Sequence, residues 1–176
     1  MEKQQEGKMD TQEMMEIYAE LATPGEHHKR LAKMVGSWDA KIKSWMEPDE
    51  PPTESIGTSE QKMILDGRFL LQEFHGEMMG SPFNGLGISG YDNGANKYIS
   101  TWIDSMGTAI LFFEGAAGPD DKTIKQIAHY DDPIQGPMDW LSVTKFVDDN
   151  TVLFEMFSID KNGKEEKMME ITYTRK

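Results

Sequence analysis

The sequence predicts a mainly β fold, an antiparallel up-and-down barrel of about ten strands preceded by two short helices. Three observations support this fold. Helical spacing of apolar residues is confined to the first 35 residues. From Ser37 onward, short alternating runs rich in β-branched and aromatic residues replace it. Turn-forming residues interrupt these runs at nine points.

The first helix is expected over residues 11–22. Asp10, with Glu13 three residues later, has the spacing of a capping box. Apolar residues then recur at helical intervals, at Met14, Ile17, Tyr18 and Leu21. This pattern predicts an amphipathic helix with one apolar stripe.

A second short helix is expected to follow and to run to about Val35. Thr23 offers a hydroxyl N-cap, Pro24 suits the first helical position, and Glu26 stands three residues after Thr23. Gly36 is expected to end this helix, because glycine adopts the left-handed conformation without Cβ strain.

The rest of the chain divides into ten strands, and most neighbours are expected to pair as hairpins. Asp66-Gly67 and Asn162-Gly163 are the most specific turn signals, because both central residues of a type I′ turn need positive φ. The other seven signals are Glu47 to Thr53, Gly80-Ser81-Pro82, Asp92-Asn93-Gly94, Met106-Gly107, Pro119-Asp120-Asp121, Asp132 to Pro137, and Asp148-Asp149-Asn150. Ten antiparallel strands exceed what a twisted open sheet usually carries, so closure into a barrel is favoured. A two-sheet sandwich is the alternative.

The chain of 176 residues is long enough for one self-supporting domain. Residues 1–10 are expected to form a flexible N-terminus, and residues 11–176 a single domain. Within it, residues 11–35 are the helical pair and residues 37–176 the barrel.

Composition excludes several functions. Acidic residues outnumber basic ones 31 to 18, for a net charge of −13, and the basic residues are scattered, so nucleic acid is not an expected partner. The chain has no cysteine, which excludes disulfides, thiolate metal sites and a cysteine nucleophile. The first ten residues are polar and no run of 18 apolar residues occurs, so we expect no membrane insertion and a cytoplasmic protein.

Gly36-Ser37-Trp38 is a G-x-W motif entering the first strand, and it resembles the opening signature of the calycin superfamily. In lipocalins and fatty-acid-binding proteins this tryptophan seals the closed end of the barrel, and an arginine near the last strand lies across it. The resemblance implies structural roles for Trp38 and for Arg175, which stands where that arginine is expected. A guanidinium stacked on indole contributes about 0.5–2 kcal/mol.

A longer resemblance covers nearly the whole chain. It rests on residues 22–28 (ATPGEHH), 36–38 (GSW), 98–106 (YISTWIDSM) and 168–173 (MMEITY), which are similar to an uncharacterised bacterial family of unknown function associated with calycin-like barrels. The resemblance implies a calycin-like barrel fold. It brings no substrate, cofactor or catalytic residues.

A barrel of about this strand number can enclose one small ligand, and alternate residues of each strand would line the cavity. On strands 152–158 and 167–175 the apolar alternates are expected to face inward. On strand 97–104 either face is a plausible interior. Our candidates for the ligand-binding wall are Tyr98, Trp102, Asp104, Trp140, Phe154, Met156 and Met169.

The histidines provide the other candidate chemistry. His27 and His28 diverge by about 100° on a helix, and neither has an i+4 ligand partner, so a solvent-exposed helix face is expected rather than a metal site. No cofactor is expected. The nitrobindins of the wider superfamily hold haem through one histidine, and His129 would be the first choice of axial ligand here.

These observations favour a binding protein for a small, largely apolar molecule. No catalytic residue is assigned, because the chain lacks G-x-S-x-G and H-E-x-x-H motifs, and Gly85-Leu86-Gly87 lies within a strand pattern, where glycines permit bending or close packing. Two alternatives stay open. One is a barrel enzyme using an interior acid or base, such as Asp104, Tyr98 or His129. The other is a filled protein-interaction module without a ligand.

Overall fold

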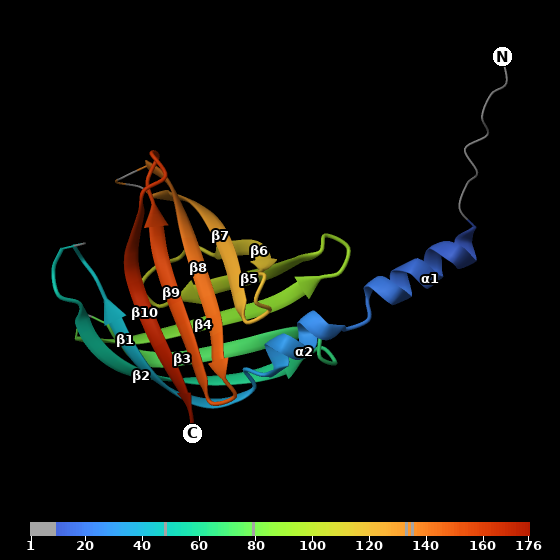
Figure 1. Cartoon of the computed structure of the whole chain (residues 1–176), viewed down its shortest axis with the longest axis horizontal. Helices are drawn as coiled ribbons and strands as arrows, with labels where there is room; N and C mark the ends of the chain where they lie inside the picture. Colours follow the sequence, from blue (N-terminus) through green and yellow to red (C-terminus); the bar gives the residue numbers. More distant parts are fainter. Residues whose placement is uncertain (1–9, 48, 79, 133, 135) are drawn as a thin grey trace, which may run out of the picture.

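A computed structural model of the chain describes residues 10–47, 49–78, 80–132, 134 and 136–176. Of the expected flexible terminus, residues 1–9 lie outside the described residues. Two helices precede ten strands in the part of the chain described (Figure 1). The helices are α1 (Thr11–Leu21) and α2 (Glu26–Ala32). The strands are β1 (Gly36–Ser44), β2 (Thr53–Ile64), β3 (Phe69–Met78), β4 (Ser81–Asp92), β5 (Lys97–Asp104), β6 (Leu111–Ala117), β7 (Thr123–Asp132), β8 (Gly136–Asp148), β9 (Thr151–Ile159) and β10 (Glu165–Arg175).

The strands close into one antiparallel barrel, which confirms the predicted fold class. Each strand pairs with its sequence neighbours, and β1 also pairs with β10 over seven residues, from Trp38 opposite Arg175 to Ser44 opposite Met169. This last pairing leaves no free sheet edge, and it excludes the two-sheet sandwich.

Helix α1 begins where the sequence predicts and ends one residue earlier. The Asp10 carboxylate accepts a hydrogen bond from the Gln12 backbone N–H, as an N-cap does. The helix projects away from the barrel and contains no buried residue (Figure 1). Its C-terminal end is held by the Asn93 amide, which donates to the carbonyl oxygens of Leu21 and Thr23.

Helix α2 begins later than predicted. Its N-cap is Gly25, because the Thr23 hydroxyl donates back to the Ala19 carbonyl of α1 instead of capping α2. The His28 imidazole takes over the capping role and accepts a hydrogen bond from the Gly25 N–H at 3.0 Å. The helix also ends at Ala32, short of the predicted Val35, and Gly36 already belongs to β1.

Helix α2 covers one end of the barrel, and its histidines are not solvent exposed as expected. His27 stacks on Tyr91 with ring centroids 3.8 Å apart, and its Nδ1 lies 3.0 Å from the Tyr98 hydroxyl. His28 is buried against the edge of Tyr91. Burial lowers the pKa of both imidazoles, and the Arg30 guanidinium lowers the pKa of His27 further. We call this the closed end of the barrel.

Trp38 and Arg175 also lie at the closed end, in the arrangement that the calycin resemblance implies. The guanidinium carbon of Arg175 is 4.1 Å from the Trp38 ring centroid. The Trp38 indole N–H donates to the Met34 carbonyl, and Arg175 donates to the Val35 and Lys33 carbonyls. These contacts tie the first and last strands to the segment that follows α2.

Candidate ligand-binding site in the barrel mouth

The strand register defines which side chains face the interior. On β1, buried Trp38, Ala40 and Ile42 alternate with exposed outer residues, and residues paired across neighbouring strands share a face. Ile42 pairs with Ile171, Ile171 with Phe154, and Phe154 with Thr144. Following the register around the barrel places all the expected wall residues on the inward face: Tyr98, Trp102, Asp104, Trp140, Phe154, Met156 and Met169.

Burial differs between the two ends of the interior. Inward-facing side chains near the closed end are almost fully buried, as Trp38, Tyr98 and Val152 show with 1% exposure each. Inward-facing side chains toward the opposite end stay partly exposed to solvent, although they line a concave wall. They are Trp102, Asp104, Trp140, Phe154, Met156 and Met169, and we call the region they line the barrel mouth.

Trp102 lies flat against the wall of the mouth. Gly87 faces Trp102 across the β4–β5 pair, and a Cβ on Gly85 or Gly87 would lie 2.2 or 3.1 Å from indole carbons. The two glycines therefore serve close packing, which is one of the roles expected from the sequence. The indole N–H donates to Asp104 Oδ2 at 2.8 Å, and Asp104 Oδ1 accepts from the Met106 N–H. Asp104 thus fixes the ring plane and caps the turn after β5.

Tyr98, a candidate for the ligand-binding wall, does not belong to the mouth. It faces inward but lies at the closed end, under α2, where the His27 ring and the Arg30 guanidinium reach its hydroxyl. Burial raises the pKa of this phenol. Tyr98 is therefore a structural residue that joins α2 to the barrel.

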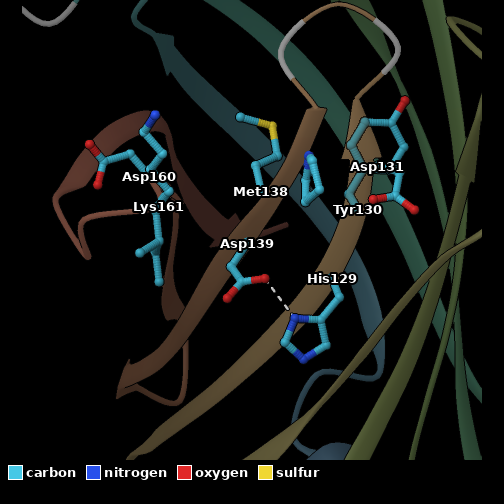
Figure 2. Close-up of a pocket in the computed structure, with 9 residues that line it drawn as sticks. His129, Tyr130, Asp131, Met138, Asp139, Asp160 and Lys161 are labelled. Atoms are coloured by element: carbon cyan, nitrogen blue, oxygen red, sulfur yellow. Dashed lines mark hydrogen bonds and ion pairs between the residues drawn. The ribbon is translucent and has the colours of Figure 1, made fainter.

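His129 faces outward and does not reach the interior. Its pairing partner Asp139 accepts a 2.6 Å hydrogen bond from Nδ1, and both residues line a hollow of about 370 Å³ on the outer rim (Figure 2). His129 therefore lies outside the barrel interior. The interior acid–base group formed by Asp104, Tyr98 and His129 is not assembled either, since the three lie at the mouth, at the closed end and outside.

The interior also carries polar side chains that sequence reasoning missed. On one wall, Gln72 Nε2 donates to the hydroxyls of Ser59 and Tyr173, at 3.1 and 3.2 Å. On the other wall, Ser100 donates to Gln126 Oε1 at 3.0 Å. Gln126 is in phase with the buried Ile124 and Ala128 of β7, and this alternation was the available signal.

In the part of the chain that the structure describes, no helix is long and apolar enough to cross a membrane. Within the same residues, no cluster of three or more histidine or acidic side chains could hold a metal ion.

The fold and the site define a calycin-like β-barrel, closed at one end by a helix and a stacked Trp–Arg pair. Residues 23–175 match the family described as "protein of unknown function (DUF1579)", and the chain belongs to that family. The predicted family resemblance is thereby confirmed. No curated protein sequence matches the chain.

Two solved structures show the same fold. The crystal structure of Rv2717c from M. tuberculosis is 12% identical, with a TM-score of 0.60 over 88% of this chain and 99% of that one. The S-type phycobiliprotein lyase CPES from Guillardia theta is 12% identical, with a TM-score of 0.59 over 85% of this chain and 92% of that one.

Proposed function

We propose that this protein binds a small, largely apolar molecule in the barrel mouth. One observation carries the proposal: large apolar side chains point inward on a concave wall, yet solvent still reaches them. Trp102, Phe154 and Met169 pack against the buried core on one side and keep the other side accessible. A ligand would cover this remaining surface.

Small residues on the inward face support the proposal, because they let the Trp102 indole lie flat against the wall of the mouth. Gly85, Gly87 and Ser89 form the inward face of β4 below the Trp102 indole, and Ser100 and Ser142 lie on β5 and β8. Each 100 Å² of apolar ligand surface removed from water contributes about 2.5 kcal/mol before the entropic cost of binding. Burial of the ligand's apolar surface can therefore account for binding by itself, without a chemical reaction of the ligand.

We also propose a cytoplasmic location. The chain has no cysteine and so needs no oxidising compartment to complete its fold.

Truncating Trp102 tests the proposal. N-phenyl-1-naphthylamine, an uncharged dye that fluoresces in apolar surroundings, serves as the reporter ligand. We expect Trp102→Ala to raise the dye's Kd about tenfold, because lost apolar contact of about 1.4 kcal/mol has that effect. Ile103→Ala is the matched control: Ile103 is the next residue on β5, faces outward and is 42% exposed. It should change Kd less than about twofold.

Thermal unfolding of both variants separates binding from folding. Because Trp102 is partly exposed, Trp102→Ala should keep a cooperative transition. A wild-type protein that does not bind the dye, or two variants with equal Kd changes, would contradict a binding site in the mouth.

A further inference from the structure

Two buried amide atoms in the barrel interior have no hydrogen-bond partner. They are Gln126 Nε2, a donor, and Gln61 Oε1, an acceptor. The glutamines are only 8% and 4% exposed, and both face inward by register. A buried polar group without a partner costs about 1–3 kcal/mol, so these two atoms mark where a polar ligand group would be stabilised.

The Gln126 amide is held in place by its neighbours. Ser100 donates to Oε1 at 3.0 Å and lies 3.1 Å from the Ser89 hydroxyl, so the carbonyl side of the amide is occupied. The N–H₂ side is free. In the strand register, Gln126 pairs with Ser142 and Ser142 pairs with Met156, which places the free donor beside the wall of the mouth.

Gln61 offers the complementary atom on the opposite wall. Its Nε2 donates to the Ser59 hydroxyl at 3.2 Å, which leaves Oε1 as a free acceptor. Gln61 lies on β2 and Gln126 on β7, and these strands are five steps apart in either direction around the ring of ten. The interior therefore presents a donor on one side and an acceptor on the other.

The interior offers no cation for an acidic ligand. Among the described inward-facing strand residues, Arg175 is the single basic side chain, and it is stacked on Trp38 at the closed end. Its three nitrogens donate to the carbonyls of Asp149, Val35 and Lys33. Arg30 of α2 lies at the same end and is paired with Asp121 and the Tyr98 hydroxyl. The charged inward-facing side chains toward the mouth are the acids Asp104 and, at the rim, Asp132 and Glu166. A carboxylate ligand would lose its hydration there without gaining a counter-charge.

We propose, resting on the proposed function, that the ligand is an uncharged amphiphile. Its carbonyl-bearing head, such as an amide or ester, accepts a hydrogen bond from Gln126 Nε2, and its apolar body covers Trp102 and Trp140. An amide head can also donate to an acceptor such as Gln61 Oε1, whereas an ester head cannot.

A matched ligand series tests the head group. Dodecanamide, methyl dodecanoate, sodium dodecanoate and dodecane compete with N-phenyl-1-naphthylamine at pH 8, where the dodecanoate carboxyl is ionised. We expect dodecanamide to displace the dye at a concentration at least about tenfold below that of dodecanoate, with the ester between them. Dodecanoate binding as tightly as the amide would overturn this inference while leaving the proposed function intact.

Variants of Gln126 test the anchor itself. Gln126→Leu should raise the Kd of dodecanamide about tenfold and leave that of dodecane unchanged, because only the amide uses the Nε2 donor. Gln126→Met keeps the length of the side chain, removes the donor, and should show the same selective loss. Lys125→Ala, on the exposed outer face of the same strand, is the control.

The outcomes separate the two proposals. An unchanged dodecanamide Kd in both folded Gln126 variants would overturn the anchor. Failure of the dye and of all four dodecyl compounds to bind the wild-type protein would instead overturn the proposed function. If Gln126→Leu fails to give a cooperative thermal transition, the Gln126→Met variant decides.

Discussion

Gly36 shows how one residue position depends on another far along the chain. Its φ is +127°, in a region that favours glycine, and a Cβ there would lie 2.8 Å from Arg175 Nη1. That nitrogen donates to the carbonyl of Val35, the residue before Gly36. The first G of the G-x-W motif is therefore required by backbone conformation and by the arginine that lies over Trp38.

We expect Gly36→Ala to lower the free energy of unfolding by about 1–3 kcal/mol, because backbone strain at the positive φ and displacement of the Arg175 guanidinium both destabilise the folded state. Gly67→Ala is the matched control. Gly67 has φ of +84°, with no atom within 4 Å of a Cβ, so only strain of about 1 kcal/mol applies there. Urea unfolding of both variants gives the difference. Equal losses would show that the Arg175 contact contributes nothing at this position.

Individual residues also explain why part of the candidate site was not predicted. Phe154, Met156 and Met169 could be assigned inward from apolar alternation, and the register agrees. Tyr98 was expected in the binding wall because alternation predicts which face of a strand a residue is on, but not at which end of the barrel it lies. Helix α2, which covers Tyr98, is far from it in the sequence. Gln126 was missed because a polar residue in a β pattern normally indicates solvent.

At the scale of elements, turns were predicted better than helix starts. Asp66 and Gly67 both have positive φ, as the central pair of a type I′ turn requires. In the other predicted type I′ pair, Asn162-Gly163, Gly163 has positive φ and Asn162 does not. The start of α2 was predicted at the wrong residue because the Thr23 hydroxyl has two alternative partners, a backbone N–H of α2 and a carbonyl of α1. Thr23 was read as an N-cap, but its hydroxyl finds the Ala19 carbonyl in the preceding helix.

Helix α2 carries a pH-dependent contribution to stability. Burial holds the pKa of His27 and His28 below the ordinary value of 6.5 in the folded protein. The Arg30 guanidinium lowers the pKa of His27 further. The carboxylates of Asp121 and Glu26 raise this pKa, but each has a smaller effect than Arg30. Below pH 6.5 the unfolded chain therefore binds more protons than the folded one, and the free energy of unfolding falls as pH falls.

We expect urea unfolding at pH 7.5 and pH 5.5 to show lower stability at the lower pH. In a His27→Gln, His28→Gln double variant this pH dependence should be smaller, because those two groups no longer titrate. His75→Gln, an exposed histidine on the outer face of β3, is the control and should keep the wild-type dependence. A double variant with an unchanged slope would contradict the assignment to α2.

At the scale of the whole molecule, the barrel and α2 form one body and α1 is an appendage. Every adjacent strand pair in the ring is hydrogen-bonded, and α2 contacts β3 and β4. Helix α1 exposes Met14, Ile17 and Leu21 at about two-fifths each and buries nothing. The overall architecture was predictable because ten strands in sequence order allow few closed arrangements. The placement of α1 was not, because the Asn93 contacts with the carbonyls of Leu21 and Thr23 leave no signal in the sequence.

Removing residues 1–21 should change the free energy of unfolding by no more than about 0.5 kcal/mol, because α1, which makes up most of the described part of this segment, contains no buried residue. Extending the deletion to residue 35 also removes α2 and the buried His28, Leu31 and Met34, and should cost several kcal/mol, roughly the loss of three buried side chains. Calorimetric Tm values of the two truncated proteins check this. A large loss from the shorter deletion would show that α1 belongs to the folded body.

The pairing of β1 with β10 also determines when during synthesis the barrel can close. Synthesis runs from the N-terminus, so β1 leaves the ribosome about 130 residues before the strand that completes its hydrogen bonding, and the growing sheet carries two open edges until then. A chain interrupted before residues 165–175 would expose those edges to other nascent chains. Protection against aggregation during translation is therefore needed until residues 165–175 have been synthesised and have paired with β1.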